Sequence, residues 1–200
     1  MTPEPDRRSF LSLAIFGIGA IFSAILGVPL IAYFVDPRNR KAPQSSFKVV
    51  ENVKLNELDI DKPVQGVIRD TRVDGWTLYP NDVIGRVWVV KKNELPADVR
   101  GEDKISEFNA KPMVEKERFF FVFTTICPHL GCSVNLNTAG NGFGCPCHNA
   151  TFALDGAKTT PEPAKRGMDS LAWQLDVIDP TRIQVEFKKF VASIEEKKSL

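Results

Sequence analysis

All four cysteines and both histidines of this 200-residue chain lie between Cys127 and His148, and no other feature limits what it can fold into so strongly. They form two groups with the patterns C-x-H-x-x-C and C-x-C-H, made of Cys127, His129, Cys132, Cys145, Cys147 and His148. Thiolate and imidazole are ligands that zinc and iron prefer in proteins. Chance scatter does not gather six such side chains in so short a stretch. The sequence therefore predicts a metal site.

A structural zinc site is the simplest interpretation of these residues. Cysteine and histidine pairs at short spacing often hold zinc, which takes four ligands. This interpretation leaves two cysteines without a role. It would make the chain a zinc-stabilised export or scaffold protein with no redox activity.

The two motifs resemble those of the Rieske [2Fe–2S] proteins, in which two histidines replace two cysteines on one of the two irons. The resemblance covers roughly the second half of the chain. It implies one [2Fe–2S] cluster, with Cys127 and Cys145 on one iron and His129 and His148 on the other. It also implies catalytic roles for the two histidines.

The two remaining cysteines favour one branch of that family. In the Rieske proteins of quinol–cytochrome c reductases, the cysteines at these positions form a disulfide, which here would join Cys132 and Cys147. Ferredoxin-type and ring-hydroxylating members generally lack the extra pair. The resemblance therefore implies the respiratory branch.

The chain after residue 46 is typical of an all-β fold. Short runs rich in β-branched and aromatic residues occur at 64–68, 83–90, 118–125, 171–178 and 182–187. Turn signals such as Asp74-Gly75 and Pro80-Asn81 separate them. The resemblance implies a Rieske-type antiparallel β-sandwich at 47–190, with an inserted cluster-binding subdomain at about 124–165.

Two charged stretches interrupt or follow these strands. Residues 91–117 carry charges of both signs and weak periodicity, so we expect a surface insertion with some helix. Residues 191–200 form a C-terminal tail, and we expect a short surface helix from Phe190 to the end of the chain.

Residues 10–35 carry no charge and are rich in Ile, Leu, Phe, Gly and Ala. As a helix they would reach roughly 39 Å, which is enough to cross a hydrocarbon core of about 30 Å. The stretch is longer than the apolar region of a signal peptide. We expect one transmembrane anchor helix, kinked or ended early at Pro29.

The residues on either side of this stretch indicate how the protein is exported and in which direction the helix crosses the membrane. Residues 1–9 contain Arg7-Arg8, which resembles a twin-arginine export signal, and we expect them in the cytoplasm. Two basic residues lie before the stretch and three lie after it (Arg38, Arg40 and Lys41). By the rule that basic residues stay on the cytoplasmic side, this count favours the opposite orientation. That rule is weakest where dedicated machinery carries a folded domain, so we expect the domain on the periplasmic face of a bacterial membrane. The polar linker at 36–46 corresponds to the hinge of the respiratory family.

The sequence departs from the family after the last histidine. High-potential members read C-P-C-H-G-S-x-Y, and the serine and tyrosine hydroxyls donate hydrogen bonds to cluster and ligand sulfurs. Here Ala150 and Phe152 replace both, with Thr151 between them. Fewer donors disfavour the reduced form, so we expect a lower potential that suits menaquinol better than ubiquinol.

The resemblance implies an oxidoreductase subunit that is not active alone. It would accept one electron from quinol at a cytochrome b partner and pass it to a c-type cytochrome. The rival is the small Rieske subunit of a periplasmic oxidase such as arsenite oxidase, which the anchor and hinge disfavour. The net charge of +1 argues against nucleic acid as a partner.

Overall fold

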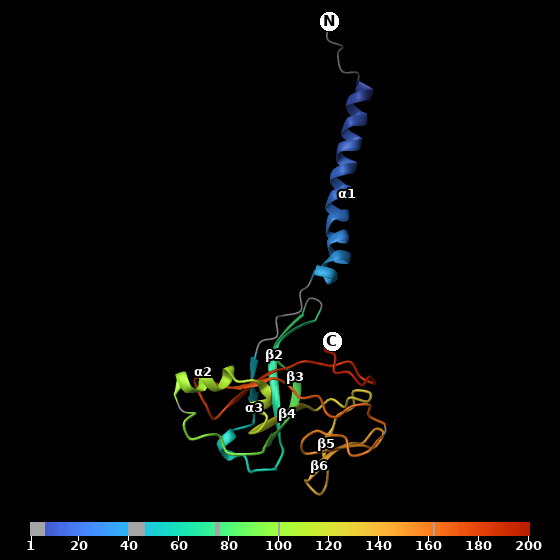
Figure 1. The fold of residues 1–200 in the computed structure, drawn as a ribbon. Coiled ribbons are helices and arrows are strands. Elements are labelled where there is room, and N and C mark those ends of the chain that lie inside the picture. Colours follow the sequence, from blue (N-terminus) through green and yellow to red (C-terminus); the bar gives the residue numbers. More distant parts are fainter. Residues whose placement is uncertain (1–6, 40–46, 75–76, 100, 162) are drawn as a thin grey trace. The chain divides into compact units, whose positions relative to one another are not determined.

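The computed structural model describes residues 7–39, 47–74, 77–99, 101–161 and 163–200 (Figure 1). The chain forms two compact units, Met1–Gln44 and Ser45–Leu200.

The first unit is built on the helix α1, Arg7–Asn39. Its stretch Arg7–Tyr33, of 27 residues, is long and apolar enough to cross a membrane. The large apolar side chains along it are exposed, as Phe16 shows at 77%. The helix continues past Pro29, so the expected early end there is wrong. It also includes residues 36–39, which we expected in the linker, while 40–46 lie outside the described residues.

The second unit contains a six-stranded sheet in the order β4-β3-β2-β1-β9-β8. All of its neighbouring strands are antiparallel. The strands are β1 Phe47–Glu51, β2 Val64–Asp74, β3 Thr77–Lys91, β4 Phe120–Thr124, β8 Trp173–Leu175 and β9 Ile183–Glu186. A short 3-10 helix, Leu55–Glu57, follows β1.

A smaller antiparallel sheet in the order β5-β6-β7 lies in the region of the two Cys/His motifs. It consists of β5 Asn135–Leu136, β6 Gly142–Cys145 and β7 Ala150–Ala153. The predicted all-β antiparallel fold with one N-terminal apolar helix is confirmed.

Two apolar clusters form the core of this unit. The first packs between the large sheet and the helices, around Trp173 and Phe108. The second contains Trp88, Phe143 and Phe152 and extends to Cys127 and Cys145. Strand β4 supplies Phe120 to the first cluster and Phe123 to the second. A strand that serves both clusters must be apolar on both faces, which accounts for its run of phenylalanines.

The expected turn at Pro80-Asn81 is wrong, because β3 runs through it. The pairing of β2 with β3 shifts register between Asp70 and Arg72, and Asn81 has a φ of 57°. The irregularity is therefore a bulge within a long hairpin. Asparagine tolerates this left-handed conformation and proline has no ladder N–H to lose.

The region 91–117 contains the helices α2, Glu102–Ala110, and α3, Met113–Lys116. Ile105 and Phe108 of α2 are buried in the first cluster. The insertion therefore covers the core and does not lie only on the surface. Its weak periodicity hid two apolar residues that are three positions apart on one helix face.

The expected C-terminal helix is also wrong. Residues 190–200 fold back on themselves, with an isolated bridge between Phe190 and Ser199. The N–H of Val191 donates to the carbonyl oxygen of Lys198 at 2.8 Å. Ser193 has a φ of 63°, which a right-handed helix cannot accommodate.

Candidate metal centre

The first Cys/His group occupies a tight loop between β4 and β5. The N–H of Cys127 donates to the carbonyl oxygen of Cys132 at 2.7 Å, and the N–H of Gly131 donates to the carbonyl oxygen of Cys127 at 2.9 Å. Gly131 has a φ of 81°, which glycine adopts without steric cost. These bonds close the loop and place its histidine at the tip.

The second group occupies the turn between β6 and β7. Cys145 is the last residue of β6 and pairs with Ala150, the first residue of β7. Asn149 has a φ of 59°, a conformation that asparagine tolerates better than most residues. The chain can therefore reverse within a few residues and present Cys147 and His148 at the turn.

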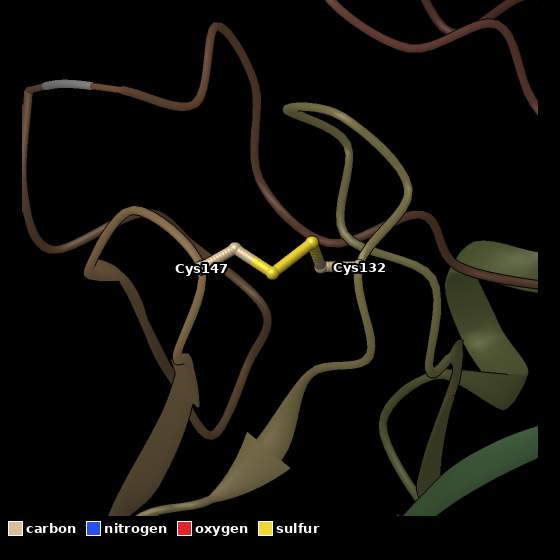
Figure 2. Close-up of a disulfide and its surroundings, with 2 residues drawn as sticks. All are labelled: Cys132 and Cys147. Atoms are coloured by element: carbon tan, nitrogen blue, oxygen red, sulfur yellow. A yellow bond between two sulfur atoms is a disulfide. The ribbon is translucent and has the colours of Figure 1, made fainter.

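A disulfide joins Cys132 to Cys147, as the resemblance implies, with their Cα atoms 6.6 Å apart (Figure 2). It links the two loops covalently (Figure 2). The sulfur of Cys145 lies within 4.8 Å of both disulfide sulfurs. A metal site made of these three cysteines is excluded, since two of the sulfurs are already bonded to each other.

The two free cysteines lie inside the centre. Cys127 and Cys145 are 1% and 3% exposed. Burial raises the pKa of the Cys127 thiol to about 11; the backbone N–H of His129 lowers it in part, and the neighbouring Cys145 thiol raises it further. A buried thiol loses its proton when a metal cation is bound, because the cation compensates the thiolate charge. This pair of sulfurs therefore fits a metal.

The two histidines lie toward the surface. Their ring centroids are 4.7 Å apart and their planes cross at 82°. His148 is exposed and His129 is half-buried. The donor set is therefore one-sided, with sulfur inside and imidazole outside. All six residues singled out in the sequence come together in the two loops.

The side chains that follow the second group give the centre an apolar wall. Ala150 and Phe152 are buried on one face of β7. Thr151 lies between them on the opposite face, because side chains alternate along a strand. Its hydroxyl shares a 2.6 Å hydrogen bond with the hydroxyl of Thr159 and also lies 3.4 Å from that of Thr160. Thr151 therefore bonds away from the cysteines and does not replace the missing donors.

Sequence reasoning missed the contacts that the C-terminal segment makes with the centre. Ser193 donates a hydrogen bond to the carbonyl oxygen of His129 at 2.6 Å. The two residues are far apart in the chain, and a lone serine in a charged tail carries no signal of such a contact. The Arg166 side chain, nearly buried beside Asp169, was missed for the same reason.

Comparison with known proteins matches residues 85–176 to the Rieske [2Fe-2S] domain family. The menaquinol:cytochrome c reductase iron-sulfur subunit of Bacillus subtilis (strain 168) is 25% identical over 167 residues, which cover 82% of this chain and 83% of the relative. The subunit of the same name from Geobacillus thermodenitrificans is 24% identical over 172 residues, covering 84% and 85%.

The chain is also similar to a subunit of a cytochrome b6-f complex. The cytochrome b6-f complex iron-sulfur subunit of Chlorobaculum thiosulfatiphilum is 26% identical over 153 residues, covering 76% of this chain and 61% of the relative. Among solved structures, the plasma membrane Rieske protein of Synechocystis PCC 6803 aligns at 26% identity with a TM-score of 0.35. It covers 55% of this chain and 85% of that one.

Proposed function

This chain belongs to the Rieske [2Fe–2S] proteins through its domain at residues 85–176, and on that premise we propose that it is the iron–sulfur subunit of a membrane quinol–cytochrome c reductase. Its cofactor is one [2Fe–2S] cluster, which supplies one-electron transfer when bound. The subunit takes an electron from quinol held by a cytochrome b partner and delivers it to a c-type cytochrome.

The ligands in this proposal are Cys127 and Cys145 on one iron and His129 and His148 on the other. The observation that carries it is the one-sided donor set, in which the two thiols are buried and the two imidazoles, with ring centroids 4.7 Å apart, lie toward the surface. Soft thiolates would hold one iron, and the imidazoles would hold the other on the side open to a partner. A closed zinc site has no need of an exposed imidazole.

His148 is the residue that we propose faces quinol, with His129 beside it. Its exposure leaves the outer ring nitrogen free to accept a hydrogen bond from the quinol hydroxyl. Quinol oxidation releases protons, and an imidazole at the surface can take one as the electron leaves.

Menaquinol is the proposed donor. Ala150 and Phe152 offer no hydroxyl to the sulfurs, and the hydroxyl of Thr151 is bonded to other threonines. A cluster with few donors favours its oxidised form and needs a low-potential reductant. The names of the Bacillus and Geobacillus relatives also support menaquinol.

The anchor and its orientation complete the proposal. We place α1 across a bacterial cytoplasmic membrane, with residues 1–9 in the cytoplasm as a twin-arginine signal and the domain at 47–190 on the outer face. The length and composition of Arg7–Tyr33 support a single pass. Of the expected linker at 36–46, the part after Asn39, where α1 ends, would serve as the hinge.

The test uses native membranes that contain the full-length protein. A menaquinol analogue should reduce the cluster, followed by its EPR signal, and a cytochrome b should co-purify with the chain. Reduction by arsenite and co-purification of a molybdenum protein would instead assign the chain to an oxidase. Failure of menaquinol to reduce a cluster that dithionite reduces would overturn the assignment.

A further inference from the structure

The C-terminal segment, residues 190–200, contacts the first ligand loop through Ser193. The backbone N–H of Ser193 donates to the carbonyl oxygen of Pro128 at 2.9 Å. Its hydroxyl donates to the carbonyl oxygen of His129 at 2.6 Å. The two acceptors are consecutive in the chain. Together these bonds fix the peptide group that joins the two residues and the backbone from which the His129 ring projects.

The backbone of Ser193 is itself held in an unfavourable conformation. Its φ of 63° lies in the left-handed region, which is costly for serine. Such a conformation persists where the surroundings over-determine it. Neighbouring contacts must therefore hold the segment on both sides of Ser193.

A buried ion pair supplies these contacts. Arg166 and Asp169 form two parallel hydrogen bonds of 2.8 Å, and their side chains are 10% and 4% exposed. The same guanidinium donates to the carbonyl oxygens of Val191, at 2.8 Å, and Ile194, at 2.6 Å. These two residues flank Ser193. A bidentate arginine with its remaining donors on backbone carbonyls is a rigid anchor.

Further contacts join the segment to the large sheet. Lys197 donates to the backbone oxygen and the hydroxyl of Ser170. The carbonyl oxygen of Asp169 accepts a hydrogen bond from the N–H of Thr124, at the end of β4, at 3.0 Å. The first ligand loop begins directly after β4, so this strand supports both the anchor and the loop.

We propose that residues 190–200 form a strap that positions His129, with Ser193 as the positioning residue and Arg166–Asp169 as its anchor. The proposal rests on the proposed role of His129 as a ligand. The strap ties the first ligand loop to the chain that follows the second one, without using the disulfide Cys132–Cys147. The ligand geometry therefore has a second, non-covalent constraint.

The variant Ser193→Gly tests the strap, because glycine accepts the left-handed backbone and lacks the hydroxyl. Ser199→Gly is the matched control, an exposed serine on the same segment. In the full-length holoprotein in detergent, Ser193→Gly should shift the g values of the reduced cluster. It should also lose the cluster to a chelator roughly fivefold faster, the factor expected for one net hydrogen bond. Ser199→Gly should match the wild type in both.

Three outcomes of these measurements would overturn the strap. If Ser193→Gly matches Ser199→Gly in both measurements while the wild type holds its cluster, the strap is wrong and the proposed ligand set stands. If the wild type binds no iron, both proposals fail together. A merely structural serine would change the rate of cluster loss and leave the g values unmoved, which would also contradict positioning.

Hydrogen exchange on the wild-type holoprotein keeps the test decisive if Ser193→Gly does not fold. The amides of residues 190–200 should be protected to the same degree as those of the loop at 127–132. Exchange of 190–200 at the rate of an unstructured tail would overturn the proposal.

Discussion

Ala150 and Phe152 determine how many hydrogen-bond donors reach the proposed cluster. Both side chains are buried, and Ala150 lies opposite Cys145 across the β6–β7 ladder. A hydroxyl at either position would become part of the apolar wall that these two side chains form beside the cysteines. The potential of the centre therefore depends on two side chains that contain no donor.

Restoring the donors with Ala150→Ser and Phe152→Tyr should raise the reduction potential stepwise. A charge-assisted hydrogen bond that favours the reduced form by about 1.5–3 kcal/mol raises a one-electron potential by roughly 65–130 mV, at about 59 mV per tenfold change. Protein-film voltammetry at neutral pH measures the shift. The wild-type potential should lie in the lower or middle part of the Rieske range of about −150 to +300 mV.

Ala153→Ser is the control for these variants. Ala153 belongs to the same strand but lies on the face of β7 opposite to Phe152. Its new hydroxyl should leave the potential unchanged. A wild-type value near the top of the range, or an unmoved potential in both single variants, would defeat the menaquinol assignment.

A glycine in the turn that follows β7 should tolerate no side chain. Gly156 has a φ of 80°, and a Cβ there would meet the ring of Phe123 at 2.6 Å. Gly101 has a φ of 83° with open space around it. Gly101→Ala should cost about 1 kcal/mol from the backbone alone. Gly156→Ala should cost roughly 1–3 kcal/mol more from the clash with buried phenylalanine, and equal costs in denaturant unfolding would contradict this packing.

At the scale of elements, the centre depends on two loops that contain little regular secondary structure. The disulfide Cys132–Cys147 and the proposed strap each tie the first loop to another part of the domain. The remaining support comes from the second apolar cluster, in which Phe143 and Phe152 are cross-strand partners. Loss of any one tie should loosen the loops without unfolding the large sheet.

The variant with Cys132→Ser and Cys147→Ser should lose roughly 3 kcal/mol of stability, since the disulfide closes a loop of 15 residues. The loss should appear in denaturant unfolding followed by the visible absorption of the cluster. The large sheet, followed by far-ultraviolet circular dichroism, should unfold with a smaller change. Coincident and unshifted transitions would show that the disulfide adds nothing.

The sequence predicts those elements whose pattern is local. β-branched and aromatic runs located five of the six strands of the large sheet, all but β1, and motif spacing located both Cys/His loops. Contacts between distant segments left no such signal, as with Ser193 and Arg166. Local rules also failed where tertiary structure overrode them, since Pro80 signals a turn but lies at a bulge inside β3.

At the scale of the whole molecule, the chain joins an apolar helix to a β domain. Cleavage at a protease site engineered between Asn39, where α1 ends, and Phe47, where β1 begins, should release a soluble domain that keeps its cluster. Membrane fractionation followed by EPR of the supernatant measures this. A domain that stays with the membrane after complete cleavage would show that α1 is not its only attachment.

Replacing Arg7 and Arg8 with lysine should leave the cluster-bearing domain in the cytoplasm, because the proposed export signal requires arginine at both positions. Protease accessibility in spheroplasts measures the location of the domain. A control with the Lys–Lys change made at Arg38 and Arg40 should be exported normally. Normal export of the double-lysine signal would disprove the proposed route.

The central claim is that Cys127, Cys145, His129 and His148 hold one [2Fe–2S] cluster. Pulsed EPR on the dithionite-reduced full-length protein, labelled with ¹⁵N at histidine only, tests it most directly. The chain contains no histidine other than these two. The proposed ligand set predicts a rhombic signal with two ¹⁵N couplings, one of which disappears in His148→Cys. A zinc-loaded protein with no signal, or a signal without histidine couplings, would contradict it.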